Sequence, residues 1–203
     1  MINISFAITA CNEVRELDRL IKQLQPCLLD EDEVIIQLDK DNASPEMWEL
    51  LKSHNNVIAY PLDKDFATFK NNVKNQCTKD YIFFIDADEE VTQDQIHLIR
   101  EILEMNPSVD CYLVPRINTV AGLTPEHIGK WGWRVDEYNR INWPDYQFRL
   151  CKNKPEIKWV GKVHEKLDGY SQMAMLPAAD VLALGHHKTI QKQERQNSFY
   201  NTL

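Results

Sequence analysis

The sequence predicts an α/β domain: a mostly parallel sheet flanked by helices, followed by a short antiparallel C-terminal part. Two observations predict this class. Short apolar segments alternate with segments of helical character over residues 3–105, and such β-then-α steps build parallel sheets covered by helices. Residues 145–165 instead hold two strand-like segments in succession, which is typical of antiparallel pairing. The length of 203 residues suits a single domain over residues 1–203.

The first two steps rest on apolar runs and helix start signals. Residues 3–10 and 33–39 are apolar runs that predict strands. Over residues 14–24, apolar side chains recur at the spacing of an amphipathic helix. Ser44 is followed directly by a proline, which is typical of a helix N-cap and its first helical position. A second helix is therefore predicted over residues 45–51.

The next two steps follow the same pattern. Residues 57–60 predict a short strand, and residues 66–77 predict a helix. Residues 81–86 form the most apolar run of the chain and predict a buried strand. The sequence T-Q-D-Q that opens the segment 92–105 matches a capping box, so a helix is predicted there. Residues 110–115 predict one more strand.

The pattern changes after this strand. Residues 117–144 hold three glycines, two prolines and three tryptophans without a clear period, and we expect a long loop or flap. Residues 145–151 and 156–165 predict a pair of strands joined by a turn at residues 153–155. The polar segment 188–203 is expected to be helical.

Composition argues against several classes of protein. The net charge of −8 and a pI of about 5.3 make nucleic acid an unlikely partner, because phosphate binding needs a basic surface. Five scattered cysteines without a C-x-x-C suggest reduced thiols. The N-terminus is a poor signal peptide, and no apolar run approaches the ~20 residues of a membrane span. We expect a cytoplasmic protein, or one peripheral to the membrane. The first glycine is Gly122, which argues against dinucleotide and P-loop nucleotide sites.

Acidic residues follow the buried strand 81–86. Asp86 and Asp88 alternate across Ala87, so their side chains can face the same way in an extended chain. Two neighbouring carboxylates repel each other unless a cation compensates them, and Mg²⁺ accepts one or two carboxylates beside phosphate oxygens and water. The alternative is that the acids favour the start of the next helix through its dipole. We expect Glu89 and Glu90 to have that role alone.

Seven segments spread over most of the chain follow one another in a fixed order. They are FAITACNE (6–13), DEVIIQLD (32–39), FATFKNNV (66–73), YIFFIDADEEVT (81–92), FRLCKN (148–153), WVGKVHEKL (159–167) and LGHHK (184–188). As an ordered set they resemble family-2 glycosyltransferases of the Rossmann-like GT-A fold, and more narrowly the lipopolysaccharide-core-type members. The segment DKDNAS (39–44) lacks the glycine that the family usually has there.

The resemblance implies a metal-dependent, inverting transfer of a sugar from a nucleoside-diphosphate sugar, with a UDP-sugar favoured. The acceptor would be a hydroxyl of a glycan or of another molecule. Mn²⁺ or Mg²⁺ would be held by Asp88, with Asp86 and His186 as further ligands and His187 as the alternative to His186. The implied donor-binding residues are Thr9, Asn12, Glu13, Asp39, Lys70, Asp86, Arg149 and His164.

The same resemblance divides the chain into a nucleotide-sugar-binding half, residues 1–115, and an acceptor and catalytic half, residues 116–203. A carboxylate must deprotonate the acceptor hydroxyl. Glu165 is the first candidate for this base and Asp145 the second. Three tryptophans of the expected loop suit sugar stacking, a donor-closing lid or ordinary packing: Trp131, Trp133 and Trp143.

Two other functions stay open at this point. A nucleotidyltransferase can share this fold and a metal-binding acid, but it normally needs a glycine-rich loop after the first strand, and residues 9–17 contain no glycine. A non-catalytic module that binds a nucleotide-sugar is the second alternative. Neither the donor sugar nor the acceptor is specified by the sequence.

Overall fold

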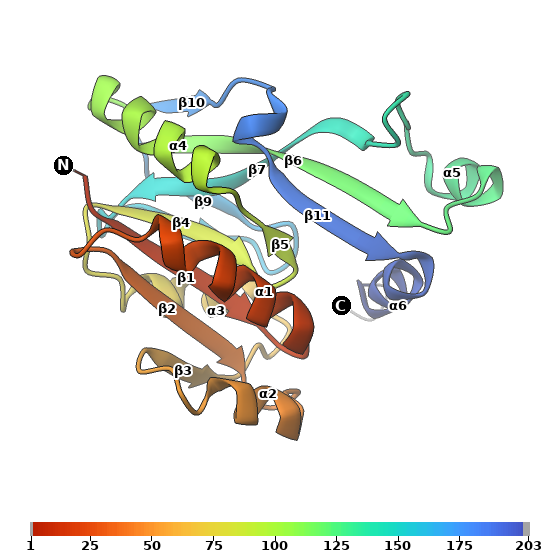
Figure 1. Ribbon diagram of the computed structural model, residues 1–203, viewed down its shortest axis with the longest axis horizontal. Coiled ribbons are helices and arrows are strands. Elements are labelled where there is room, and N and C mark those ends of the chain that lie inside the picture. The colour runs from red at the N-terminus through yellow and green to blue at the C-terminus, as the bar shows by residue number, and fades with distance from the viewer. Residues whose placement is uncertain (1, 201–203) are drawn as a thin grey trace.

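The structure is a computed structural model that describes residues 2–200, with side chains described for residues 2–198. Strands and helices alternate through the first half of the chain (Figure 1). They are β1 (Ile4–Ala10), α1 (Val14–Leu24), η1 (Gln25–Cys27), β2 (Glu33–Asp39), α2 (Pro45–Leu51), β3 (Val57–Tyr60), α3 (Phe66–Lys74), β4 (Tyr81–Asp86), β5 (Glu89–Glu90) and α4 (Gln93–Met105). Strands dominate the second half. The elements of this half are β6 (Cys111–Ala121), α5 (Pro125–Trp131), β7 (Ile141–Lys152), β8 (Lys158–Val160), β9 (Lys166–Asp168), β10 (Met173–Met175), η2 (Asp180–Leu182), β11 (Leu184–Thr189) and α6 (Ile190–Tyr200).

One sheet organises the chain, in the order β3-β2-β1-β4-β7-β6-β11-β5, with β10 beside β6. Strands β3, β2, β1 and β4 are mutually parallel, and β11 runs parallel to β6. Strand β7 is antiparallel to both of its neighbours, β4 and β6. The predicted class, a mostly parallel sheet flanked by helices with an antiparallel C-terminal part, is confirmed. Strand β4 is central, as expected of its apolar sequence.

Alternate residues of the central strands feed two hydrophobic cores. On one face, Phe83 and Ile85 of β4 pack with the apolar stripes of α1 and α4. On the other face, Ile82 and Phe84 pack with α3 and with Trp159 of the β8–β9 hairpin. The two-residue period of a strand explains this division, since successive side chains point to opposite faces. The sheet is therefore buried on both faces, which is why its strands are apolar runs.

Helix start signals in the sequence proved reliable. The Ser44 side chain accepts a hydrogen bond from the Met47 amide at 3.3 Å, and the following proline begins α2. The Thr92 side chain accepts a hydrogen bond from the Gln95 amide at 3.1 Å, which starts α4 at the predicted place. The end of α3 was less well predicted, because the helix stops at Lys74 and not at Cys77.

Three expectations for the second half and the acidic segment are wrong. The segment 117–144 is not one loop, because β6 continues to Ala121, α5 follows, and β7 begins at Ile141. The predicted strands 145–151 and 156–165 do not pair with each other. Strand β7 pairs with β4 and β6, whereas β8 pairs with β9. Glu89 and Glu90 form the short strand β5 against β11 and do not merely precede a helix.

The helical expectation for the tail is confirmed as far as the structure describes it, because α6 spans Ile190–Tyr200. Residues 201–203 of that expectation lie outside the described residues. No helix among residues 2–200 is long and apolar enough to cross a membrane.

Candidate functional site

The carboxyl ends of β1 and β4 are joined at one edge of the sheet. The Thr9 hydroxyl donates to Oδ1 of Asp86 at 3.0 Å, and the Ala87 amide donates to the Thr9 carbonyl at 2.9 Å. Because parallel strands end at the same edge, β2 ends there too, and so do β6 and β11 (Figure 1). Ligands of open α/β sheets bind at this edge. The acids that follow β4 therefore lie where a ligand is expected.

Asp86 is held by three cationic or hydroxyl partners. Besides Thr9, the Arg149 guanidinium contacts its Oδ2 at 2.5 Å and the Lys70 ammonium lies 3.6 Å from Oδ1. Burial by itself would raise the pKa of Asp86, but Arg149 and Lys70 hold that pKa well below its ordinary value. Asp86 therefore stays ionised, and both of its oxygens have protein partners. Those partners favour a role in binding or positioning over a role as metal ligand.

Glu89 completes a buried ion network beneath Asp86. Its side chain is fully buried, and its Oε1 lies 2.7 Å from Arg149 and 3.3 Å from Arg116. Its Oε2 accepts the Asp86 amide at 2.9 Å. The antiparallel pairing of β5 with β11 turns this side chain inward. Sequence reasoning assigned Glu89 only to a helix start, because the partners come from β6 and β7 and are distant in the chain.

Asp88 faces a different set of groups, supplied by the end of the chain. Its Oδ2 lies 3.4 Å from Nε2 of His186 and 3.5 Å and 3.4 Å from the ammonium groups of Lys188 and Lys192. Burial alone would raise the pKa of Asp88, but these neighbours hold it well below its ordinary value. The strand β11 supplies His186 and Lys188, and the first turn of α6 supplies Lys192.

A chain of hydrogen bonds fixes the orientation of His186. The Asp145 carboxylate accepts the Asn118 side-chain amide at 2.7 Å, so the Asn118 oxygen is left to face Nδ1 of His186 at 2.6 Å. Burial lowers the pKa of His186, which favours the neutral ring. With its hydrogen on Nδ1, the neutral ring would direct its Nε2 lone pair to a cation shared with Asp88. Two acceptors placed in this way suit a shared cation.

The geometry separates His186 from His187. Successive residues of β11 point to opposite faces, and Nδ1 of His187 meets the Thr119 hydroxyl at 2.6 Å on the exposed side. Among the described residues, no group of three or more His, Cys, Asp or Glu side chains converges as metal ligands. Asp88 and His186 still fit a divalent cation, because Mg²⁺ commonly takes few protein ligands and completes its shell with water and substrate phosphates.

The two candidate bases differ in how they are bound. Asp145 accepts hydrogen bonds from Arg116, Asn118 and Gln147, each at 2.7 Å. Burial would raise the pKa of Asp145, but the Arg116 charge and these donors lower it. Glu165, by contrast, forms an ion pair with the buried Lys70 at 2.7 Å. Protein donors therefore occupy both oxygens of Asp145, whereas Glu165 contacts the ammonium of Lys70.

The β8–β9 hairpin brings Glu165 to the site. The Asn71 side chain of α3 exchanges hydrogen bonds of 2.8 and 2.9 Å with the Trp159 backbone, and Lys70 lies over the Trp159 ring at 4.7 Å. The hairpin turn includes His164, which is exposed and has a φ of 55°. Lys70 therefore links two predicted residues, because the same ammonium contacts both Glu165 and Asp86.

The loops after β1 and β2 carry the remaining predicted donor-binding residues. The Asn12 side chain joins the two loops through the Asn42 carbonyl and the Ser44 amide, each at 2.6 Å. The Glu13 carboxylate accepts the amides of residues 11 and 12. Asp39 is 3% exposed and accepts the Leu62 amide at 3.2 Å. These polar side chains shape the loops that border the carboxyl ends of β1 and β2.

The three tryptophans do not form one platform. Trp131 and Trp133 pair with ring centroids 4.6 Å apart at the end of α5, and His127 stacks on Trp131. Trp143 instead packs against the Arg140 guanidinium, 4.5 Å from its centroid. In Figure 1, α5 lies away from the main body of the sheet. The indole rings of these residues thus pack against each other, against His127 and against Arg140.

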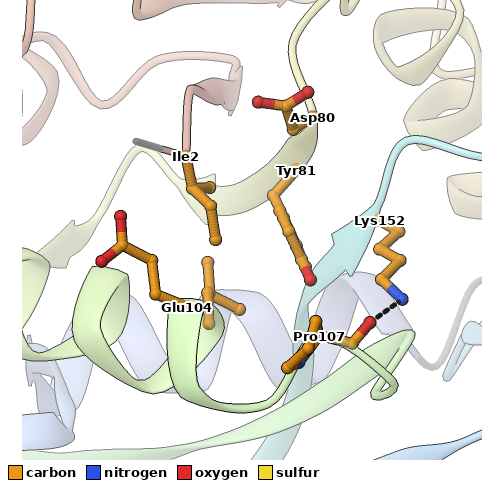
Figure 2. Close-up of a pocket in the computed structure, with 7 residues that line it drawn as sticks. Ile2, Asp80, Tyr81, Glu104, Pro107 and Lys152 are labelled. Atoms are coloured by element: carbon orange, nitrogen blue, oxygen red, sulfur yellow. Dashed lines mark hydrogen bonds between the residues drawn. The ribbon is translucent and has the colours of Figure 1, made fainter.

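An open depression of about 510 Å³ lies at the other edge of the sheet. Tyr81 at the start of β4 and Lys152 at the end of the antiparallel β7 both line it, as Figure 2 shows. The Lys152 ammonium donates to the Pro107 carbonyl at 2.6 Å. The depression is thus separated from Asp86 by the length of β4, and it is not part of the carboxylate site.

Sequence comparison places the chain among known proteins. The family model described as glycosyl transferase family 2 matches residues 5–157. A TPR repeat-containing protein of Synechococcus elongatus is 24% identical over 161 residues, which cover 79% of this chain and 35% of that protein. The chain thus spans about a third of that relative's length. The narrower resemblance to lipopolysaccharide-core-type members is not tested by these matches and stays a prediction.

Structural comparison gives the same fold. The S. aureus TarS 1–349 structure in complex with UDP-GlcNAc has a TM-score of 0.62 and 13% sequence identity, covering 92% of this chain and 58% of that one. The complex of the same protein with UDP has a TM-score of 0.62 and 11% identity, covering 91% and 60%. At this identity the likeness shows the fold. Both comparisons agree with the architecture described above.

Proposed function

The chain belongs to glycosyl transferase family 2, and from this premise we propose that it transfers a sugar from a nucleoside-diphosphate sugar to an acceptor hydroxyl with inversion. The observation that carries the proposal is the acidic end of β4, where Asp86 and Asp88 meet two distinct sets of partners within the family-2 domain. Residues 1–115 would supply the donor side, and residues 116–203 the acceptor and catalytic side. UDP-sugars are the first donors to test, because TarS, which shares the fold, has been crystallised with UDP-GlcNAc.

In this proposal Asp88 and Nε2 of His186 would hold Mn²⁺ or Mg²⁺. Such a cation would supply electrostatic stabilisation of the leaving diphosphate. The Asn118 and Asp145 side chains keep the Nε2 lone pair of His186 directed at the site, as such supporting groups do for metal-binding histidines. Asp86, fixed by Arg149, is assigned to the ribose or sugar hydroxyls of the donor. An ionised carboxylate accepts hydrogen bonds from such hydroxyls well.

Glu165 is assigned the role of general base. Its carboxylate would remove the proton of the acceptor hydroxyl while that oxygen attacks the donor's anomeric carbon from the face opposite the diphosphate. Lys70 holds Glu165 beside Asp86 through two ion pairs, which positions the base relative to the donor. A carboxylate held by a single lysine contact is better suited to this task than Asp145, whose oxygens accept hydrogen bonds from Arg116, Asn118 and Gln147.

The activity test is release of UDP from a panel of UDP-sugars by the full chain, with and without Mn²⁺ or Mg²⁺. We expect turnover with at least one donor and its loss in Asp88→Asn. His186→Ala should also lose turnover, whereas His187→Ala is the matched control and should retain it. Equal effects of the two histidine changes would contradict the assignment of His186. Turnover that is unchanged by chelation and by Asp88→Asn would contradict the metal role.

The base is tested separately. Glu165→Gln should lower kcat by a factor of roughly 10²–10⁴, the usual contribution of general-base catalysis, and leave donor affinity nearly intact. Glu156→Gln removes an exposed carboxylate before the same hairpin and serves as the control. Loss of donor binding in Glu165→Gln would move Glu165 from catalysis to donor binding.

A further inference from the structure

Two lysines that the proposed function does not use converge on Asp88. Lys188 is four residues before Lys192, and the junction of β11 and α6 lies between them. Their ammonium groups lie 3.5 and 3.4 Å from the same oxygen, Oδ2 of Asp88. The Lys188 side chain is 5% exposed and that of Asp88 is 15% exposed. Two ammonium groups thus contact one carboxylate oxygen, and the Lys188 and Asp88 side chains that take part are largely buried.

The neighbouring carboxylates are compensated by other cations. Glu89 is matched by Arg149 and Arg116, and Asp86 is matched by Arg149 and Lys70. Lys192 has one further acidic partner, Glu16 of α1, at 3.1 Å. Lys188 and Lys192 are therefore balanced by Asp88 and Glu16 as long as no cation is bound. A divalent cation held by Asp88 would leave a surplus of positive charge there, because the two ammonium groups would then face a like charge.

An anion beside Asp88 would balance this surplus, and the substrate of the proposed reaction contains one. We propose that Lys188 and Lys192 bind the diphosphate of the donor and retain it as the leaving group. This inference rests on the proposed function. Lysine is suited to the task, since its ammonium is a point charge with three donors that phosphate oxygens accept.

The charge change of the reaction explains why two lysines are useful. The bond between the anomeric carbon and the diphosphate oxygen breaks, and its electron pair stays on that oxygen. A bond forms between the anomeric carbon and the acceptor oxygen, whose proton passes to Glu165. The diphosphate thus gains one negative charge as the bond breaks. Cations placed against that charge stabilise the transition state more than the bound donor.

A purely structural role of Lys192 predicts a different result. In that role the Lys192 ammonium joins α6 to α1 by donating a hydrogen bond to Glu16. The Lys188 ammonium holds the same helix by donating a hydrogen bond to Oε1 of Gln196. Removal of Glu16 would then have the same effect as removal of Lys192. In our proposal, Glu16→Gln leaves both ammonium groups in place and does not weaken diphosphate binding.

The experiment compares the binding of UDP, uridine and inorganic pyrophosphate by calorimetry, in the full chain with Mn²⁺ present. Lys188→Met and Lys192→Met should each weaken UDP and pyrophosphate about tenfold or more, as expected for loss of a charged hydrogen bond, and leave uridine unchanged. Lys22→Met, which removes an exposed lysine paired with Asp18 on α1, is the matched control. Glu16→Gln is the control for the tether.

Mn²⁺ binding without nucleotide gives a second readout, followed by water-proton relaxation. Removing either lysine should tighten Mn²⁺ binding, because a like charge is removed, whereas Asp88→Asn should weaken it. Thermal unfolding of each variant checks that the fold persists.

Several results would overturn the inference: unchanged UDP affinity in both lysine variants, an equal loss for uridine, weaker Mn²⁺ binding, or a Glu16→Gln variant that behaves like Lys192→Met. A wild-type chain that binds neither UDP nor pyrophosphate would overturn the proposed function as well.

Discussion

The buried carboxylate of Glu89 should contribute more to stability than any exposed acid of the same segment. Glu89→Gln keeps the shape of the side chain and removes its charge. The guanidinium groups of Arg149 and Arg116, which lie 2.7 and 3.3 Å from Glu89, would then share one carboxylate fewer in a water-excluded place. Removal of one partner from a buried ion pair typically costs 3–5 kcal/mol. Because glutamine keeps an oxygen that accepts hydrogen bonds, we expect the lower end, about 3 kcal/mol.

The assay is urea unfolding of the full chain, monitored by tryptophan fluorescence and circular dichroism. Glu90→Gln is the matched control, because Glu90 is the next residue, its side chain is 25% exposed, and its ion pair with Arg19 has a length of 3.0 Å. Such partly exposed pairs contribute about 0–1 kcal/mol. A difference in unfolding free energy of less than about 0.5 kcal/mol between the two variants would refute the reasoning.

Three further predictions concern other parts of the molecule. Gly169→Ala should destabilise the chain by about 3 kcal/mol or more in urea unfolding, because its φ is 85° and an added Cβ would lie 2.0 Å from the backbone oxygen of residue 156. Gly132→Ala, at a φ of 64° with open space around it, should cost only about 1 kcal/mol, and equal costs would contradict the steric argument. Hydrogen bonds from Lys154 and a backbone amide lower the pKa of Asp110, so its contribution is present above pH ~4 and is lost as the pH falls. Asp110→Asn should therefore flatten the loss of stability below pH 4 in acid titration, and an unchanged slope would contradict this. Burial raises the pKa of Cys11 and Cys77 to about 12, so neither thiol should react quickly with Ellman's reagent at pH 8 in the folded chain, although all five cysteines should react in denaturant.

Local signals in the sequence determined the first half of the fold. Each strand from β1 to β4 is an apolar run, and α2 and α4 begin at the side-chain caps that Ser44 and Thr92 provide. Such signals depend on neighbours only a few residues away, so they are readable without tertiary structure. The edge of the sheet that carries Asp86 and Asp88 also followed from the alternation, because parallel strands place their carboxyl ends together.

The second half could not be predicted in the same way. Strand β7 contains Pro144 and Asp145 and lacks a clear apolar period, yet it occupies a central place between β4 and β6. Its pairing depends on contacts across more than 60 residues of chain with β4, such as that between Phe83 and Leu150. No local pattern encodes such a pairing, so the strand was joined to the wrong partner.

The sequence by itself determined which chemical groups lie at the end of the central strand. The apolar run 81–85 predicts a buried strand, and the D-x-D that follows it places two carboxylates at the end of that strand. Only the tertiary structure decided how those groups divide. It set Asp86 and Glu89 against buried arginines and Asp88 against His186, Lys188 and Lys192. The physical reason is that charge compensation acts through space. The cations that neutralise these acids come from α3, β6, β7, β11 and α6, and only the folded chain brings those elements to β4.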